Sequence, residues 1–196
     1  MPRDATSELN QNLLILSESE VLNLEKTKKI CFVTNEYMPV SAGGIGMLVE
    51  QAVSALSESD DIQITVILLG SESFVDAVKF HGSEHYAGVE FVGVRDMLDS
   101  LLAEMVLPKW AFSFETYYLS YLVGEYLLRR EQKDAFDVIE FPDYKGFGYV
   151  TLKHKRLAGA FQHTHLVVRV HGATRIWNQI DGVDVHSRER LQLYQM

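Results

Sequence analysis

Short apolar runs alternate with amphipathic segments along most of the chain. The runs that we expect to form strands are Ile30–Thr34, Ile62–Leu69, Gly88–Val94, Phe136–Phe141 and Leu166–Val170. Most of these runs are continuous and rich in β-branched residues, as in strands buried on both faces, whereas Gly88–Val94 alternates. Apolar residues at helical spacing predict helices at Ile45–Leu56, Met97–Leu107, Phe112–Arg130 and Tyr149–Phe161. This alternation predicts an α/β fold, a doubly wound, mostly parallel Rossmann-like sheet with helices on both faces.

Three segments fit this alternation less well. Ser71–Ala87 has no clear period, and Ala173–Val185 is loop-like. Ser187–Met196 opens a helix, with Ser187 as a plausible N-cap. In the tyrosine-rich helix Phe112–Arg130, we expect the aromatic residues to pack on the sheet rather than to bind a cofactor.

Composition indicates a single globular domain. The 196 residues are 47% hydrophobic, which is enough for a sizeable core. We expect residues 1–27 to form a polar, partly ordered leader and residues 28–196 to form the domain. No apolar run is long enough to span a membrane, and the N-terminus lacks the basic start and long apolar centre of a signal peptide. We therefore expect a cytoplasmic protein.

Charge and cysteine content narrow the function classes. The net charge of −9 argues against broad nucleic-acid binding. The one cysteine, Cys31, lies inside the first strand and is better explained as a small core residue than as a nucleophile. Three short basic groups are mainly expected to be solvated, with weak peripheral contact at the inner membrane face as a second interpretation. These groups are Lys26 with Lys28 and Lys29, Lys153 with Lys155 and Arg156, and Arg188 with Arg190.

A metal site is not expected from the sequence. His81 and His85 would share one face if their segment were helical. Structural zinc usually needs four ligands, and no further ligand-type residues follow at suitable spacing. We therefore predict no metal.

The strongest candidate for chemistry is the stretch from Ile30 to Gly46. It reads as a strand, a polar loop, three glycines and the start of a helix, the glycines being Gly43, Gly44 and Gly46. Backbone N–H groups at a helix start are unpaired and the helix dipole favours negative charge, so this is a natural phosphate site. The structural alternative is that the glycines only turn the chain and pack the helix on the sheet.

Two other predicted strands end in polar residues. Glu140 and Asp143 lie at the end of one strand, and Arg169 and His171 lie at the end of the next. If the strands are parallel, these residues and the glycines converge on one edge of the sheet. An arginine in a buried strand needs a partner, which Glu140 or Asp143 could supply. Structural roles are the alternative: a solvated strand end, a turn cap and a hydrogen-bonded histidine.

These motifs together resemble one known family. The segments Ile30–Pro39, Gly43–Gly46, Phe136–Asp143 and Val168–Gly172 are similar, in this order, to the N-terminal domain of family-4, GT-B-fold glycosyltransferases. The resemblance covers residues 28 to 175. It implies one half of a two-domain enzyme that transfers a sugar from a nucleotide-sugar to a carbohydrate or lipid-linked acceptor. It also implies retention at the anomeric carbon, no cofactor besides the donor substrate and usually no metal.

The resemblance also implies roles for individual residues. The three glycines would lie against the donor diphosphate, and His171 would sit beside the transferred sugar as the catalytic residue. The acceptor pocket would be near Glu140, Asp143 and Arg169. Loops such as Ser71–Ala87 and Ala173–Val185 would read the acceptor. The family's second domain, which binds most of the nucleotide, is not among these 196 residues, so we expect this chain alone to be inactive.

Two other functions are compatible with an α/β fold of this kind, a dinucleotide-dependent oxidoreductase and a non-enzymatic binding module. A dinucleotide-dependent oxidoreductase places its Gly-x-Gly-x-x-Gly fingerprint directly after the first strand. Here eight residues separate Thr34 from Gly43 and the pattern is Gly-Gly-x-Gly, so the fingerprint is not met. A non-enzymatic α/β module that binds a nucleotide or a partner remains the alternative to a glycosyltransferase half.

Overall fold

The computed structural model describes residues 27–102 and 115–170. Within these ranges the strands form one parallel sheet with the order β3-β2-β1-β4-β5. The elements are β1 (Lys28–Thr34), α2 (Gly44–Leu56), β2 (Ile62–Leu68), α3 (Glu72–His85), β3 (Glu90–Gly93), α4 (Val94–Leu102), α5 (Glu115–Asp134), β4 (Val138–Pro142), the 3-10 turn η2 (Tyr144–Gly146), α6 (Tyr149–Ala158) and β5 (His165–Arg169).

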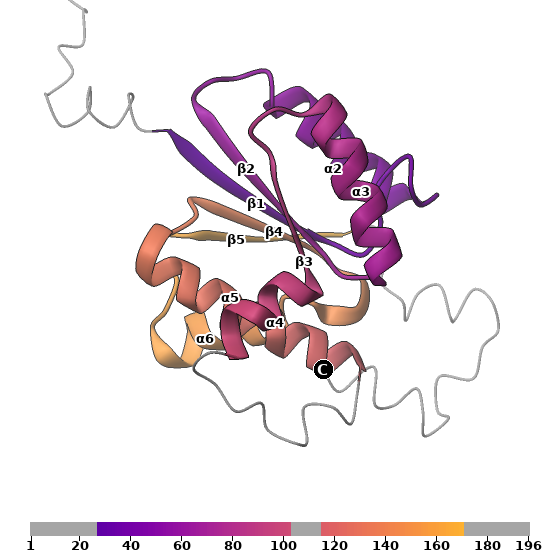
Figure 1. The fold of residues 1–196 in the computed structure, drawn as a ribbon. Helices are drawn as coiled ribbons and strands as arrows, with labels where there is room; N and C mark the ends of the chain where they lie inside the picture. The colour runs from indigo at the N-terminus through magenta and orange to yellow at the C-terminus, as the bar shows by residue number, and fades with distance from the viewer. Residues whose placement is uncertain (1–26, 103–114, 171–196) are drawn as a thin grey trace, which may run out of the picture.

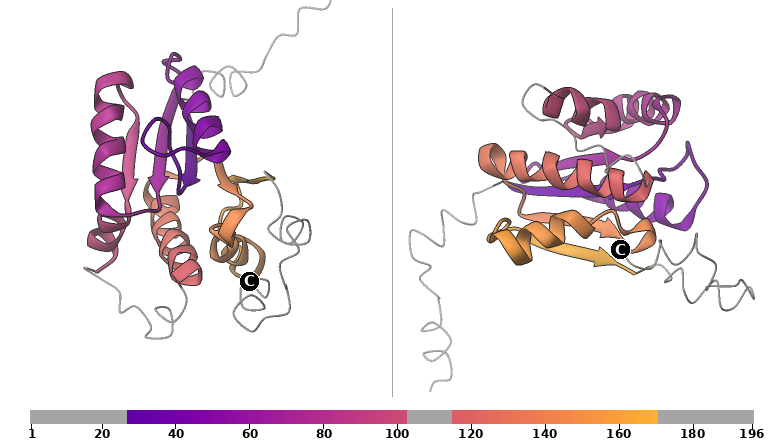
Figure 2. Two further views of the ribbon diagram at one scale, coloured as in Figure 1. Left: turned by 90° about the vertical axis from the view of Figure 1, so that its right-hand side faces the viewer. Right: turned by 90° about the horizontal axis from the view of Figure 1, so that it is seen from below.

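The sheet lies between two helical layers, as Figures 1 and 2 show. Helices α2 and α3 cover one face, and α4, α5 and α6 cover the other. Right-handed crossovers explain this division, because the chain first adds strands on one side of β1 and later on the opposite side. The predicted doubly wound α/β fold with helices on both faces is therefore confirmed.

Two hydrophobic clusters fill the spaces between the layers. Along β1, Cys31 and Val33 belong to the cluster under α4, α5 and α6, whereas Phe32 belongs to the cluster under α2 and α3. Burial on both faces explains why the strands read as continuous apolar runs. Cys31 is fully buried, and this burial raises the pKa of its thiol, so its predicted role as a core residue is confirmed.

Helix α5 is the long helix of the crossover between β3 and β4. It buries Leu122, Tyr126 and Leu127 against the sheet, so the predicted packing of its aromatic residues is confirmed for Tyr126. Tyr117, Tyr118 and Tyr121 are only half-buried.

The segment without a clear sequence period proved to be helical. Ser71 caps α3 by accepting a hydrogen bond from the Phe74 amide at 3.3 Å, and Val75, Val78 and Gly82 face the core. The apolar pattern was hidden because Phe80 on the same helix is 67% exposed. The interpretation of Ser71–Ala87 as a loop is therefore wrong. His81 and His85 do share a helix face, with ring centroids 4.2 Å apart.

The last described strand also differs from its prediction. We expected Leu166–Val170 to be buried, but β5 is an edge strand of the described sheet, and Val168 is 42% exposed. Apolar β-branched residues are typical of strands both at the edge and at the centre of a sheet. The residues of β5 therefore did not show which of these positions the strand takes.

Several predictions lie outside the described residues. They concern the leader up to residue 26, the end of the predicted helix Met97–Leu107, His171, the loop Ala173–Val185 and the helix Ser187–Met196. In the ranges that the structure describes, no helix has the length and apolar character needed to cross a membrane.

Candidate functional site

The strand order reverses at β1, which pairs with β2 on one side and β4 on the other. In open α/β sheets, ligands bind beyond the carboxyl ends of the strands at such a switch point. Here that position is bounded by the loop that follows β1, the start of α2 and the residues that follow β4. These segments form the candidate site.

Side chains hold the loop after β1 in place. The buried Thr34 hydroxyl donates to the Glu36 carbonyl at 2.7 Å and accepts from the Glu36 amide at 3.1 Å. The Tyr37 amide donates to the Ser41 hydroxyl at 2.8 Å, and the Met38 amide donates to the Gly46 carbonyl at 3.4 Å. The loop is thus fixed against the first turn of α2.

The three glycines have three different surroundings. At Gly46 an added Cβ would lie 2.8 Å from the Tyr37 backbone nitrogen, so this glycine is required for α2 to pack on the loop. At Gly43 an added Cβ would overlap the Glu36 carboxylate. At Gly44, which is exposed, a Cβ would meet no atom within 4 Å. Gly46 therefore packs the helix, as the structural interpretation expects, and Gly44 leaves open space at the helix start. Phosphate binding by the glycines stays a prediction.

Glu36 places a carboxylate at the start of α2. Its Oε2 accepts a hydrogen bond from the Gly46 amide at 3.4 Å, and no side-chain cap is provided by the N-cap residue Gly43. A negative charge is favourable here because the helix dipole and unpaired amides attract it. The α2 N-terminus therefore interacts with an anion from its own chain, and a phosphate from outside would compete with Glu36.

Asn35 adds a polar atom that lacks a partner. Its Oδ1 is buried at the end of β1 and accepts no hydrogen bond. A buried amide oxygen without a donor is costly, so Oδ1 is a candidate acceptor for a hydrogen bond from a bound molecule. The Tyr37 hydroxyl is also unpaired, but Tyr37 is fully buried, packs edge-on against Phe91 and belongs to the core.

No motif in the sequence marks Asn35 or Glu36 as a site residue. The signal available was their position, since both are polar and directly follow a buried strand at the edge where ligands bind. The apolar pattern predicts where β1 ends, but it does not predict that the Glu36 side chain turns back to the start of α2.

Glu140 and Arg169 form the ion pair that the sequence suggested. The Arg169 Nε and Nη2 donate to the two Glu140 carboxylate oxygens at 2.5 and 2.8 Å. This pairing raises the pKa of Arg169. The Asp143 amide donates to the Arg169 carbonyl at 3.1 Å, so the ends of β4 and β5 are joined by backbone as well. The structure thus brings Glu140, Asp143 and Arg169 together, while His171 lies outside the described residues.

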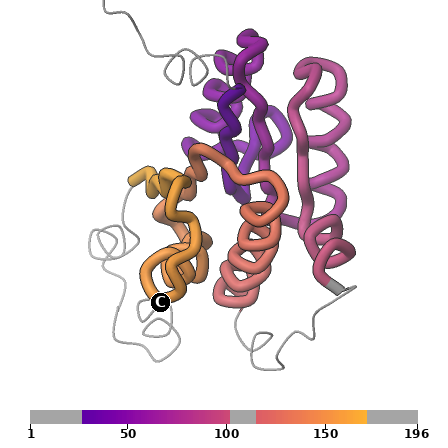
Figure 3. The backbone as a smooth tube through the Cα atoms, turned by 90° about the vertical axis from the view of Figure 1, so that its left-hand side faces the viewer, coloured from indigo at the N-terminus to yellow at the C-terminus, as the bar shows by residue number. Residues whose placement is uncertain are grey.

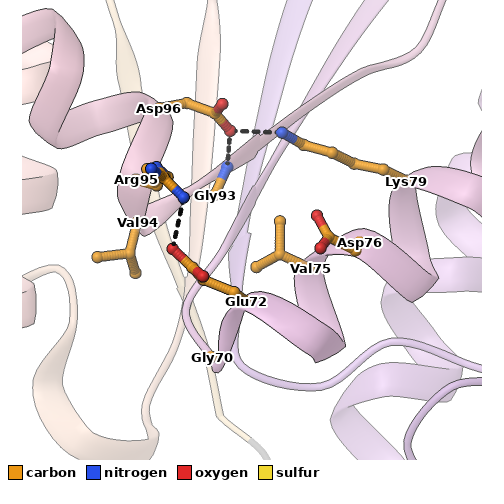
Figure 4. A pocket seen from close by; sticks show the side chains of 9 residues that line it. All are labelled: Gly70, Glu72, Val75, Asp76, Lys79, Gly93, Val94, Arg95 and Asp96. Carbon is orange, nitrogen blue, oxygen red and sulfur yellow. Dashed lines mark hydrogen bonds and ion pairs between the residues drawn. The ribbon is translucent and has the colours of Figure 1, made fainter.

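A separate cavity of about 130 Å³ lies at the ends of β2 and β3, between α3 and α4 (Figure 4). Two ion pairs line it: Lys79 contacts Asp96 at 2.6 Å, and Arg95 contacts Glu72 at 3.1 Å. Asp96 also accepts from the Gly93 amide at 2.6 Å and so ties α3 to the start of α4. These two ion pairs join α3 to α4 across the cavity, so the side chains that line it hold the two helices together.

No group of three or more His, Cys, Asp or Glu residues in the described ranges is arranged to hold a metal ion. No protein-family model matches the chain, and a search of curated proteins found no significant match. The resemblance to glycosyltransferases therefore rests on the motifs quoted above and stays a prediction.

The two neighbouring glycines of α2 should respond differently to alanine. Gly46→Ala should lower the free energy of unfolding by about 1–3 kcal/mol, because the new methyl group is forced against the Tyr37 backbone. Gly44→Ala should leave stability unchanged or raise it slightly, because the position is open and alanine favours the helix. Urea denaturation of both variants measures the difference. Equal destabilisation by the two would contradict the assignment of separate roles.

Stability at acid pH should depend on Asp96. Partial burial raises its pKa, but hydrogen bonds from Lys79 and the Gly93 amide outweigh this and hold the pKa below its usual value. A lowered folded-state pKa contributes stability above the unfolded pKa of about 3.9, and this contribution is lost as the pH falls further. Asp96→Asn should therefore flatten the loss of stability between about pH 5 and pH 2. Denaturation curves should show no such change for Asp99→Asn, the control on the same helix.

Proposed function

We propose that this chain is the acceptor-side half of a retaining glycosyltransferase with a GT-B fold. It would act in transferring a sugar from a nucleotide-sugar to a carbohydrate or lipid-linked acceptor. The observation that carries the proposal is the start of α2, where an exposed Gly44 and the Gly46 amide lie at the switch point of the sheet and an anionic side chain already binds. The order of motifs along the chain supports the same function.

The α2 N-terminus suits the chemistry of a leaving diphosphate. As the bond to the sugar breaks, negative charge accumulates on the phosphate oxygens. Fixed backbone N–H donors and the helix dipole stabilise that charge without reorganising. In this proposal the donor diphosphate replaces the Glu36 carboxylate at the Gly46 amide, so Glu36 keeps the helix start paired until the donor arrives.

Two groups are candidates for the sugar and the acceptor. The unpaired Asn35 Oδ1 can accept a hydrogen bond from a sugar hydroxyl. Both carboxylate oxygens of Glu140 are engaged by Arg169, so we assign Glu140 to positioning that guanidinium rather than to proton abstraction. His171 follows β5 in sequence, and its catalytic role is carried over from the resemblance.

Neutralising Glu36 should strengthen diphosphate binding. Glu36→Gln removes the negative charge that competes for the α2 amides, and we expect about threefold tighter binding of a nucleoside diphosphate, from the usual strength of a charge at a helix terminus. An NMR titration with UDP, ADP and GDP measures the affinity, and the amide signals of residues 44–47 should shift.

The matched control is Glu58→Gln, which removes the same charge beyond the opposite end of α2. It should leave the affinity unchanged. Shifts confined to the cavity between α3 and α4, or weaker binding by Glu36→Gln, would exclude the α2 N-terminus as the diphosphate site.

Sugar transfer separates the enzyme from a binding module. In a preparation of the native polypeptide that releases nucleoside diphosphate from a nucleotide-sugar, His171→Ala should lower kcat by about 100-fold, the usual effect of losing one transition-state hydrogen-bond donor. The melting temperature should stay unchanged, and His163→Ala, an exposed histidine before β5, should keep full activity. If no preparation of the unchanged polypeptide transfers sugar, the result supports the binding module instead.

A further inference from the structure

Helix α6 presents an unusual outer surface. Tyr149, Leu152, Lys153, Arg156 and Leu157 follow the i, i+3, i+4, i+7, i+8 spacing of one helix face. We call these five residues the α6 outer face. Leu157 is 74% exposed and Leu152 is 39% exposed, whereas the buried residues of the helix, Val150 and Thr151, lie on the other side. The outer face is thus both apolar and cationic.

Several polar side chains of α6 point the other way. His154 Nε2 lies 3.1 Å from the Glu125 carboxylate of α5. Lys155 donates to the carbonyls of Phe161 and Thr164 at 2.8 and 2.7 Å. Lys155 is therefore used inside the fold and does not act with Lys153 and Arg156 as one basic group. If this face of α6 were only a solvated surface, polar residues would be expected on it. Leucines lie there instead, and the polar His154 and Lys155 face the protein.

The packing against α5 fixes this orientation. The Val150 amide at the start of α6 donates to the buried Ser120 hydroxyl at 3.1 Å. A Cβ at Gly124 of α5 would come within 2.7 Å of the Val150 side chain, so the two helices are in close contact. Rotation of α6 to hide its leucines would break these contacts.

Charge supports a single kind of partner. The stretch Tyr144–Val170 contains five Lys and Arg residues and no Asp or Glu, in a chain with a net charge of −9. The Lys153 ammonium lies 5.3 Å from the Tyr149 ring centre, and Lys145 lies 5.4 Å from that of the exposed Tyr144. Leucine, tyrosine and basic residues on one face are typical of segments that lie on an anionic bilayer.

We propose that the α6 outer face binds the surface of an anionic lipid membrane. Lys153 and Arg156 would contact the headgroups, and Leu152 and Leu157 would enter the boundary with the acyl chains. The position fits, because α6 lies in the outer helical layer at the β5 end of the sheet, away from α3 (Figure 3). An acidic protein is the less favoured partner, since a standard protein interface needs about 800 Å² on each side and α6 is a ten-residue helix. This proposal does not depend on the proposed sugar transfer.

Vesicle binding tests the proposal. The 196-residue chain is sedimented with vesicles of phosphatidylcholine containing 30% phosphatidylglycerol and with pure phosphatidylcholine vesicles, at low salt. We expect binding only to the anionic vesicles, with weakening as salt is raised. The double variant K153Q/R156Q should reduce the partition coefficient roughly 30-fold, from the usual contribution of each cation near an anionic surface. Leu157→Ser should reduce it roughly tenfold by removing one buried leucine.

Control variants distinguish binding through the α6 outer face from nonspecific attraction of the whole chain to the vesicles. K133Q/R95Q removes the same charge from exposed positions on α5 and α4, and Phe80→Ser removes an exposed apolar side chain from α3. Both should bind as the unchanged chain does, and circular dichroism checks that every variant is folded. No sedimentation with anionic vesicles, equal binding to neutral ones or equal losses in the control variants would overturn the proposal. A face that serves an acidic protein instead would give the first of these results.

Discussion

Burial of β1 on both faces is the constraint on which the rest of the structure depends. Its side chains alternate between two clusters, with Cys31 and Val33 on one side and Phe32 on the other. A parallel strand in this position must be covered twice, and right-handed crossovers can do so only with helices that come from opposite halves of the chain. The strand order then has to reverse at β1, which creates the crevice beyond its carboxyl end.

Three polar residues at that crevice make contacts, or lack a partner, in ways that core packing does not explain. Thr34 turns the chain at the end of β1, Glu36 folds back onto the α2 amides, and Asn35 keeps a buried oxygen unpaired. Backbone amides at a helix start need partners, which a side chain, water or a ligand can supply. Here the Glu36 carboxylate accepts a hydrogen bond from the Gly46 amide.

The sequence was sufficient to predict those elements whose apolar residues repeat with the period of a strand or a helix. The central strands, α2 and α6 follow from apolar spacing. Glu140 was one of the two partners that the sequence offered for Arg169, although Arg169 proved to be exposed and not buried in the strand. Features that depend on which residues lie next to each other in the folded chain could not be predicted from the sequence. Exposed Phe80 obscured the helical period of α3, and the valines of β5 did not show that their strand lies at an edge. The fold-back of Glu36 depends on three-dimensional proximity to Gly46 across the loop.

The two proposed binding surfaces belong to different helical layers, and they attract anions through different interactions. The start of α2 favours an anion through backbone dipoles, with a competing carboxylate that weakens the attraction. The outer face of α6 favours anions through side-chain charge and adds two leucines that a soluble phosphate would not contact. A small anionic ligand should therefore select α2, and an extended anionic surface should select α6. With the sheet between them, a protein bound to a membrane through α6 could keep the α2 N-terminus accessible to a soluble donor.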